Sequence, residues 1–248
     1  MLRFLVIFFA GLAAGAMNAL AGGGSFVSFP ILVWAGLPEV AANASSTVAL
    51  VPAALASAFA YRRDLRRIGE APLALMLVVS MIGGGLGAIL LLATPEATFG
   101  VVVPWLLLLA CLMFAFGARL GARLRRVIHI DGRKILVCQF ALAIYGGYFG
   151  GAVGIMLLAV WGLLGDLDFK EMNPAKVVLV GSMNAVAVLF FVAAGIVRWE
   201  ETLVMLVAAA IGGYGAALLA RRLDPRHIRT SVIVVSAAMT AWFFIRGQ

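Results

Sequence analysis

Charged residues are scarce in this chain. Only 12% of its 248 residues are Asp, Glu, Lys or Arg, whereas 64% are hydrophobic, and the mean hydropathy is +1.10. A soluble domain of this length needs far more polar side chains to cover its surface. The shortage of charge therefore excludes a soluble fold and predicts a helical protein that crosses a lipid bilayer several times.

Histidine is almost absent as well. The two histidines, His129 and His227, lie in basic segments between apolar runs, so no metal cluster or serine–histidine pair can form inside the membrane. A rhomboid-like protease built on Gly24-Ser25 would lack its base, and the sequence contains no P-loop for ATP hydrolysis. We therefore expect no enzymatic activity, no bound metal and no cofactor.

Acidic residues are missing from the middle of every apolar run, so the usual carboxylate proton relay is absent. An anion exporter could still run on the membrane potential, which favours outward movement of one negative charge by about 2.3 kcal/mol per 100 mV. The two cysteines, Cys111 and Cys138, lie in apolar segments and predict small core residues, not a disulfide. Glutamates stand at the ends of apolar runs, at Glu39, Glu70, Glu96, Glu200 and Glu201.

The net charge of +8 comes mainly from three short segments. Of the 19 Lys and Arg residues, 14 lie in residues 62–67, 119–134 and 221–229. Such clusters mark cytoplasmic loops and attract anionic headgroups, so they indicate topology and lipid contact, not nucleic-acid binding. We expect these loops in the cytoplasm and both chain termini outside.

The apolar segments fall into two length classes. Two short runs, 24–37 and 152–165, have about half the length that a full crossing needs. They either cross the membrane fully or re-enter it on the same side. The long runs are 3–21, 41–61, 71–93, 98–117, 134–150, 174–196, 201–220 and 227–246.

The chain repeats itself with an offset of about 129 residues, which indicates an internal duplication. Basic loops of one half match non-basic loops of the other, so the halves are expected to be inverted in the membrane. We predict one all-α polytopic membrane domain, residues 1–248, with repeat 1 at about 1–117, a basic linker at 118–133 and repeat 2 at about 134–248. Each repeat has about five segments, including a glycine-broken, re-entrant or half-length helix pair. The matched positions are Gly22 with Gly151, Gly36 with Gly165, Asn43 with Asn173 after one inserted residue, and residues 83–87 with 212–215.

Glycines stand just before or at the start of both short runs, at residues 22–24 and 150–154. Irregular backbone at membrane depth is tolerated only where it is buried in protein or lines an aqueous cavity. Free amides at the start of a half-helix make a site for an anion, so we expect a transporter site near the bilayer midplane. Alternatively, the glycines only permit close helix packing. We favour that explanation for residues 83–87 and 212–215, which could also support a homodimer.

The stretches AGGGSFVSFPILVWAGLPEVAANASST, YGGYFGGAVG and NPAKVVLVGSMNA resemble the TauE/SafE family, which comprises sulfite exporters and toluene-sulfonate uptake permeases. The resemblance covers nearly the whole chain. It implies transport of small sulfur-containing anions, such as sulfite, sulfonates and sulfoacetate, across the bacterial inner membrane. Lys176 and Asn184 match a lysine and an asparagine that the family carries in the second-half helix.

Lys176 is the most informative ionisable residue. A lysine at the bilayer centre costs about 2.5–3.5 kcal/mol, so one placed there is usually functional. It could instead snorkel to the headgroups from a helix end. Both explanations stay open, and the family resemblance favours an anion contact.

The other polar residues also have two explanations each. Asn43 and Thr47 share one helix face, with Ser46 beside them, and these residues could offer neutral donors to an anion. Asn43 could instead cap its helix. The Asn of Asn173-Pro174 could cap a helix in the same way. Ser182 and Asn184 either line the cavity or bond a neighbouring helix. The predicted substrate-binding residues are Asn18, Gly22, Gly23, Gly24, Ser25, Asn43, Ser46, Thr47, Tyr148, Gly150, Gly151, Lys176, Ser182 and Asn184.

These observations together predict a secondary-type transporter that exports small sulfur-containing anions by alternating access between the repeats. One alternative is an uptake permease for a sulfonate or a carboxylate. The other is a membrane scaffold without transport activity, which would not need matched glycine breaks or a lysine beside one.

Overall fold

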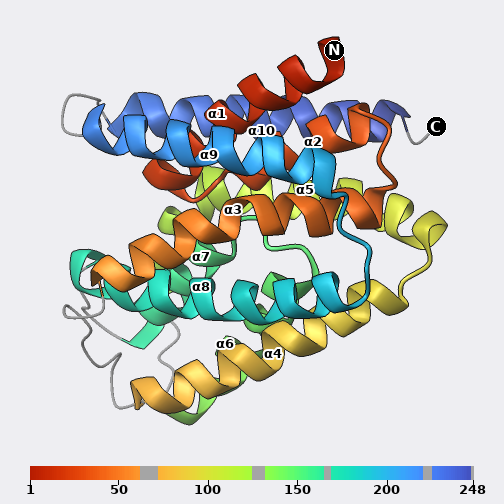
Figure 1. Cartoon of the computed structure of the whole chain (residues 1–248). Coiled ribbons are helices and arrows are strands. Elements are labelled where there is room, and N and C mark those ends of the chain that lie inside the picture. Colours follow the sequence, from red (N-terminus) through yellow and green to blue (C-terminus); the bar gives the residue numbers. More distant parts are fainter. Residues whose placement is uncertain (62–71, 125–131, 165–168, 220–224, 247–248) are drawn as a thin grey trace. The chain divides into compact units, whose positions relative to one another are not determined.

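A computed structural model describes residues 1–61, 72–124, 132–164, 169–219 and 225–246. These residues form ten α-helices and one short 3₁₀ helix, with no strand among them, which confirms the all-helical prediction (Figure 1). The predicted loop 62–67 and parts of loops 119–134 and 221–229 lie outside the described residues. The helices are α1 (Leu2–Ala21), α2 (Ser25–Trp34), α3 (Glu39–Tyr61), α4 (Leu73–Ala93), α5 (Glu96–Leu124), α6 (Gly132–Tyr148), α7 (Val153–Trp161), η1 (Gly162–Leu164), α8 (Phe169–Ala193), α9 (Trp199–Leu219) and α10 (Pro225–Arg246).

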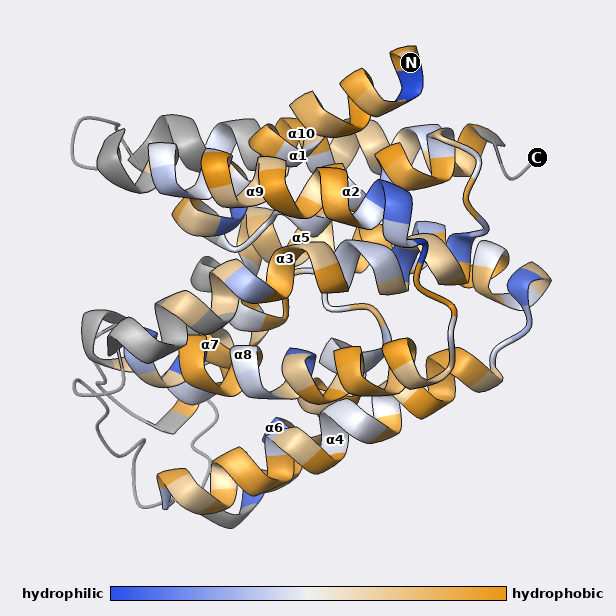
Figure 2. Ribbon diagram, viewed as in Figure 1, coloured by the Kyte–Doolittle hydropathy of each residue, from blue (hydrophilic) through white to orange (hydrophobic). Residues whose placement is uncertain are grey.

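Membrane-spanning length and apolar composition coincide in several of these helices. A bilayer offers backbone groups no water, so an apolar segment there must satisfy its own hydrogen bonds as a helix. Figure 2 shows hydrophobic residues over most of the long helices. Within the described residues, the segments long and apolar enough to cross a membrane are Leu2–Leu20, Leu73–Ala93, Glu96–Gly117 and Met172–Ala193.

The order of long and short helices is the same in the two halves of the chain. Each half has one long helix, one short helix and three long helices, as α1–α5 and again as α6–α10. The short helices α2 and α7 have 10 and 9 residues. At 1.5 Å per residue they are about 15 and 14 Å long, roughly half of a hydrocarbon core of about 30 Å. The two half-length segments predicted from the sequence are thus present as helices.

The helices group into two compact units, and each unit takes helices from both halves. Unit 1 comprises Met1–Ala53, Leu92–Cys111 and Phe191–Gln248. Its main contact is between α1 and α9, the first helix of one half and the fourth of the other (Figure 1). Small residues make this crossing close: a Cβ on Gly15 would collide with the backbone of Ala209, and one on Gly212 with the backbone of Leu12.

The short helix α2 has a mostly buried surface in unit 1. Phe29 is fully buried and stacks on Phe243 of α10, with ring centroids 5.4 Å apart, and meets Phe99 of α5 edge-to-face at 6.4 Å. Val27 packs in a cluster with Leu50 of α3 and small residues of α1 and α9. Burial of these apolar side chains, not the helix's own length, holds a ten-residue segment helical.

Unit 2 comprises Ala54–Leu91 and Leu112–Phe190. Here α4 crosses α6, again the fourth helix of one half on the first helix of the other. A Cβ on Gly83 would lie 2.6 Å from Cβ of Ala143, and a Cβ on Gly84 would lie 2.6 Å from the carbonyl oxygen of Met183 in α8. The glycines of 83–87 and Gly212 therefore serve close helix packing, as favoured from the sequence.

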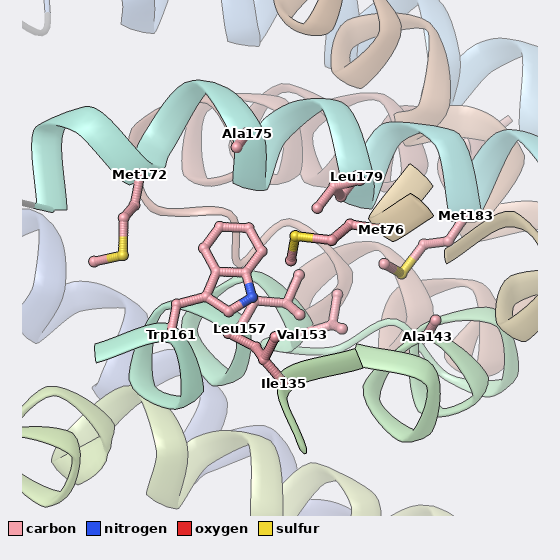
Figure 3. Packing of buried hydrophobic residues seen from close by; sticks show 10 residues of the cluster. All are labelled: Met76, Ile135, Ala143, Val153, Leu157, Trp161, Met172, Ala175, Leu179 and Met183. Atoms are coloured by element: carbon pink, nitrogen blue, oxygen red, sulfur yellow. The ribbon is translucent and has the colours of Figure 1, made fainter. Parts of the chain in front are cut away.

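The core of unit 2 surrounds one face of α7 (Figure 3). Val153, Leu157 and Trp161 follow one another at four-residue spacing, and each is buried. They meet apolar residues of three other helices. The remaining residues of the cluster are Met76 of α4, Ile135 and Ala143 of α6, and Met172, Ala175, Leu179 and Met183 of α8.

Candidate functional site

The first glycine break, in unit 1, is a tight reversal between α1 and α2. α1 ends at Ala21, and Gly22 adopts a left-handed conformation, with φ 75°, that favours glycine. The amide of Gly22 donates to the carbonyl oxygen of Asn18 at 3.0 Å, which closes the last turn of α1. α2 then begins at Ser25, after the N-cap residue Gly24.

Three consecutive amides at this break have no acceptor among the described residues. They belong to Gly23, Gly24 and Ser25, of which the two glycines are buried. The Asn18 side chain lies beside them, since a Cβ on Gly24 would be 2.8 Å from its Cβ. That position would also be 2.6 Å from the carbonyl oxygen of Ala14, so only glycine fits there. The start of α2 thus presents unsatisfied N–H groups at the positive end of the helix dipole.

Hydroxyl groups connect α2 to α3 within the same unit. The hydroxyl oxygens of Ser28 and Ser46 are 2.6 Å apart, and both residues are buried. Thr47 donates its hydroxyl to the carbonyl oxygen of Asn43 at 2.9 Å. Asn43 is itself buried and is the fifth residue of α3, so the helix-cap explanation for it was wrong. The side chains of this group face the protein interior, not a helix end.

The second glycine break, in unit 2, contains two left-handed residues. Gly150 has φ 78°, and Ala152, the N-cap of α7, has φ 58°. A left-handed alanine costs roughly 1–2 kcal/mol, so the surrounding contacts hold this turn in place. One such contact is the hydroxyl of Tyr145, which donates to the carbonyl oxygen of Gly151 at 2.7 Å.

This break also presents free amides, four in a row. The N–H groups of Gly151, Ala152, Val153 and Gly154 find no acceptor in the described part of the chain, whereas Ile155 donates to the carbonyl oxygen of Ala152 at 3.0 Å. The first three of these residues are buried. Helix N-termini of this kind bind anions through their amides and dipole.

Lys176 lies against this second break. Its stem covers Gly154: a Cβ there would be 3.2 Å from Cδ, 3.6 Å from Cγ and 3.8 Å from Cε of the lysine. Lys176 is the eighth residue of α8, about 10 Å from the helix start, and is half-buried. Its ammonium has no hydrogen-bond or ion-pair partner within the described ranges. The helix-cap explanation for Asn173 was wrong, because α8 begins at Phe169 and contains Pro174.

Ser182 and Asn184 lie further along α8. Ser182 donates its hydroxyl to the carbonyl oxygen of Leu179 at 2.8 Å. Asn184 is two turns beyond Lys176 on the same face, and its buried Oδ1 has no hydrogen-bond partner among the described residues. Asn184 therefore retains hydrogen-bonding capacity, while the Ser182 proton is used within its own helix.

The structure thus brings the predicted residues together in two groups, one per unit. The first group contains Asn18, Gly23, Gly24 and Ser25, with Asn43, Ser46 and Thr47 on the adjacent α3; the second contains Gly150, Gly151 and Lys176. The predicted substrate-binding residues did not include Ser28, nor Ala152, Val153 and Gly154, although these last three lie in the predicted break at residues 150–154. Ser46 and Lys176 occupy matched positions, and each contacts the short helix of its own half, but the sequence carried no signal for the partners Ser28 and Gly154.

The fold is that of a multi-pass membrane protein, because it is helical and contains several apolar spans. Its half-length helices present free amides, which makes their starts candidate anion sites. The model of the family "Sulfite exporter TauE/SafE" matches residues 7–243, and the chain belongs to this family. It is a membrane transporter of that family, not an enzyme.

Curated relatives agree with this assignment. A "Probable membrane transporter protein" of Haemophilus influenzae is 29% identical over 95% of this chain and 92% of the relative. The "Probable membrane transporter protein YfcA" of Escherichia coli K12 is 25% identical over 95% of this chain and 87% of the relative. A third, "ORF9" of Sinorhizobium, is 26% identical over 94% and 89%. No solved structure matches the chain significantly.

Proposed function

We propose that this protein exports a small sulfur oxyanion, such as sulfite or sulfoacetate, across the bacterial inner membrane. The observation that carries the proposal is the juxtaposition in unit 2 of four free amides, residues 151–154, with the stem of Lys176. The four backbone amides and the ammonium group of Lys176 are all hydrogen-bond donors. A deprotonated sulfite or sulfonate group carries only acceptor oxygens, so it complements such a set without leaving a donor unpaired.

Lys176 supplies the charge in this proposal. An ammonium desolvated by the protein interacts more strongly with an anion than it would in water, while amides fix the direction of approach. The matched position in the first half, Ser46, is neutral. Lys176 is thus the one charged group among the predicted binding residues, which suits a substrate with one charged head, such as a sulfonate.

The transport mechanism that we propose is alternating access at the bilayer midplane, with the two halves inverted in the membrane. Support comes from the repeated helix order and from a broken helix at the matched place in each half. Outward movement of one negative charge gains about 2.3 kcal/mol per 100 mV when the interior is negative. Export therefore needs no proton relay.

Ligand binding tests the proposal first. Purified protein is heated with sulfite, sulfoacetate, taurine, sulfate or thiosulfate, and the melting temperature is compared with that of the free protein. A ligand at 100 times its Kd stabilises the folded state by about 2.7 kcal/mol, so a substrate raises the melting temperature clearly. Wild-type protein that responds to none of these anions would favour the scaffold alternative.

Flux tests the direction and driving force. Protein in proteoliposomes is loaded with the anion that binds, and a potassium diffusion potential is clamped at several values. Efflux rising with a potential negative inside supports potential-driven export. Flux that ignores the potential but follows a pH gradient contradicts this mechanism, and accumulation against the potential favours the uptake permease.

A further inference from the structure

The short helix α7 is tied at its C-terminal end by a buried chain of hydrogen bonds. Trp161, the last residue of α7, donates its indole N–H to Oε1 of Gln139 in α6 at 3.2 Å. Gln139 donates through Nε2 to the hydroxyl of Ser80 in α4 at 2.7 Å. All three residues are fully buried, so the chain runs through the interior of unit 2. Hydrogen bonds of this kind are directional and are costly to leave unmade when buried.

Unit 1 has no equivalent of this hydrogen-bond chain at the matched positions. At the 129-residue offset, Gln139 corresponds to Ala10, Ser80 to Ala209 and Trp161 to Leu32. These residues are buried as well, and Ala10 and Ala209 belong to one apolar cluster of unit 1. The polar chain is therefore not required by the helix crossing itself, which forms in unit 1 from small apolar residues. It occurs in unit 2, the unit that contains Lys176.

The position of α7 matters because its other end presents the free amides. Trp161 lies eight residues after Val153, about 12 Å along the helix axis. A helix of nine residues moves as one body, so a rotation or slide at Trp161 carries the amides of residues 151–154 with it. Apolar contacts resist such movements weakly, since they are not directional. The hydrogen bond to Gln139 specifies one rotation and one axial position.

We propose that Gln139 is a positioning residue for anion binding, which it supports through Trp161 by setting the orientation of α7 relative to Lys176. This inference rests on the proposed function. Gln139→Leu removes the acceptor at similar volume, and we expect the Kd for the anion to rise about tenfold, as for other residues that orient a binding group from behind. Gln139→Glu should restore affinity, because a buried neutral acid offers one donor and one acceptor, as the amide does.

The experiment measures anion Kd, by titration of purified protein with sulfite and sulfoacetate, for Gln139→Leu, Trp161→Phe and the double variant. Once Gln139 is gone, Trp161→Phe should weaken binding no further, so the two effects are not additive. Ile135→Val, in the same core on α6, is the matched control and should leave the Kd unchanged while lowering the melting temperature slightly.

Each outcome decides. The positioning role of Gln139 is overturned if Gln139→Leu binds the anion with the same Kd as wild type. It is also overturned if the effects of Gln139→Leu and Trp161→Phe on the Kd are strictly additive, or if Gln139→Glu binds the anion as weakly as Gln139→Leu. If Gln139→Leu does not fold, Trp161→Phe decides alone, because phenylalanine keeps an aromatic ring but removes the indole N–H: a wild-type Kd for this variant overturns the inference. A wild-type protein that binds no anion overturns the proposed function and this inference with it, whereas loss confined to the variants supports both.

Discussion

Substitution of Gly154 by alanine should separate stability from binding. Gly154 lies in the first turn of α7 with an ordinary helical conformation, so alanine fits its backbone. Replacing glycine by alanine inside a helix stabilises it by about 0.5–1 kcal/mol. The three atoms nearest the new Cβ all belong to the flexible stem of Lys176, the closest being Cδ at 3.2 Å. We therefore expect Gly154→Ala to keep or raise the melting temperature.

The same methyl group should weaken anion binding. The stem must yield by a few tenths of an ångström, and the ammonium at its end moves further, by about 1 Å. At an effective dielectric constant of about 20, an ion pair at 4 Å is worth about 4 kcal/mol, and at 5 Å about 0.8 kcal/mol less. That difference corresponds to a Kd about fourfold higher. Gly154→Val, with two further methyl groups, should exceed tenfold.

Isothermal titration of purified protein with sulfite or sulfoacetate measures this Kd, and a thermal melt of the same sample measures stability. Gly162→Ala is the matched control. It lies at the other end of α7, has a right-handed backbone with φ −59°, and a Cβ there has no atom within 4 Å. Equal Kd values for Gly154→Ala and Gly162→Ala would refute the contact between Lys176 and the anion.

Three further outcomes follow from the same geometry. Lys176→Met should raise the anion Kd at least tenfold and Lys176→Arg less, as titration would show, because Arg keeps the charge; equal losses would contradict a charge contact. Gly84→Leu, which would drive a side chain into the backbone of Met183, should destabilise the protein by more than about 2 kcal/mol in thermal melts, whereas Gly215→Ala in open space should not. Arg3→Ala should lower the melting temperature more than Glu201→Gln, because the first leaves a buried carboxylate unpaired and the second leaves a half-exposed arginine; the reverse order would contradict this ion pair.

Most of the fold could be predicted from hydropathy. Each of the ten helices overlaps an apolar segment predicted from the sequence, because in a bilayer length and apolarity leave an unbroken segment little alternative to a helix. The two short helices were predictable for the same reason, from short runs preceded by glycines. Helix starts were less predictable. Asn173-Pro174 suggests a helix start, yet α8 begins at Phe169 and continues through Pro174, with Met172 buried in the core of unit 2, so tertiary context overrides the local capping signal.

The candidate site could be predicted only in part. The breaks at Gly22 and Gly150 were visible, because left-handed turns favour glycine. Lys176 stood out because charge is rare in the spans. The contact of Ser46 with Ser28, and of Lys176 with Gly154, depends on how neighbouring helices rotate about their axes. Rotation follows from packing of many side chains, which no local pattern encodes.

Hydropathy and glycine spacing by themselves determined an all-helical membrane chain with a glycine break before a short helix in each half, because each segment must satisfy its own backbone hydrogen bonds in lipid. Only the tertiary structure decided which helices meet. α1 packs on α9 and α4 on α6, so each half packs against the other, at the small residues where two backbones can approach closely. The same packing joins Trp161, Gln139 and Ser80, three residues far apart in sequence, into one buried hydrogen-bond chain. Spatial proximity, not sequence pattern, gives these ordinary residues their role.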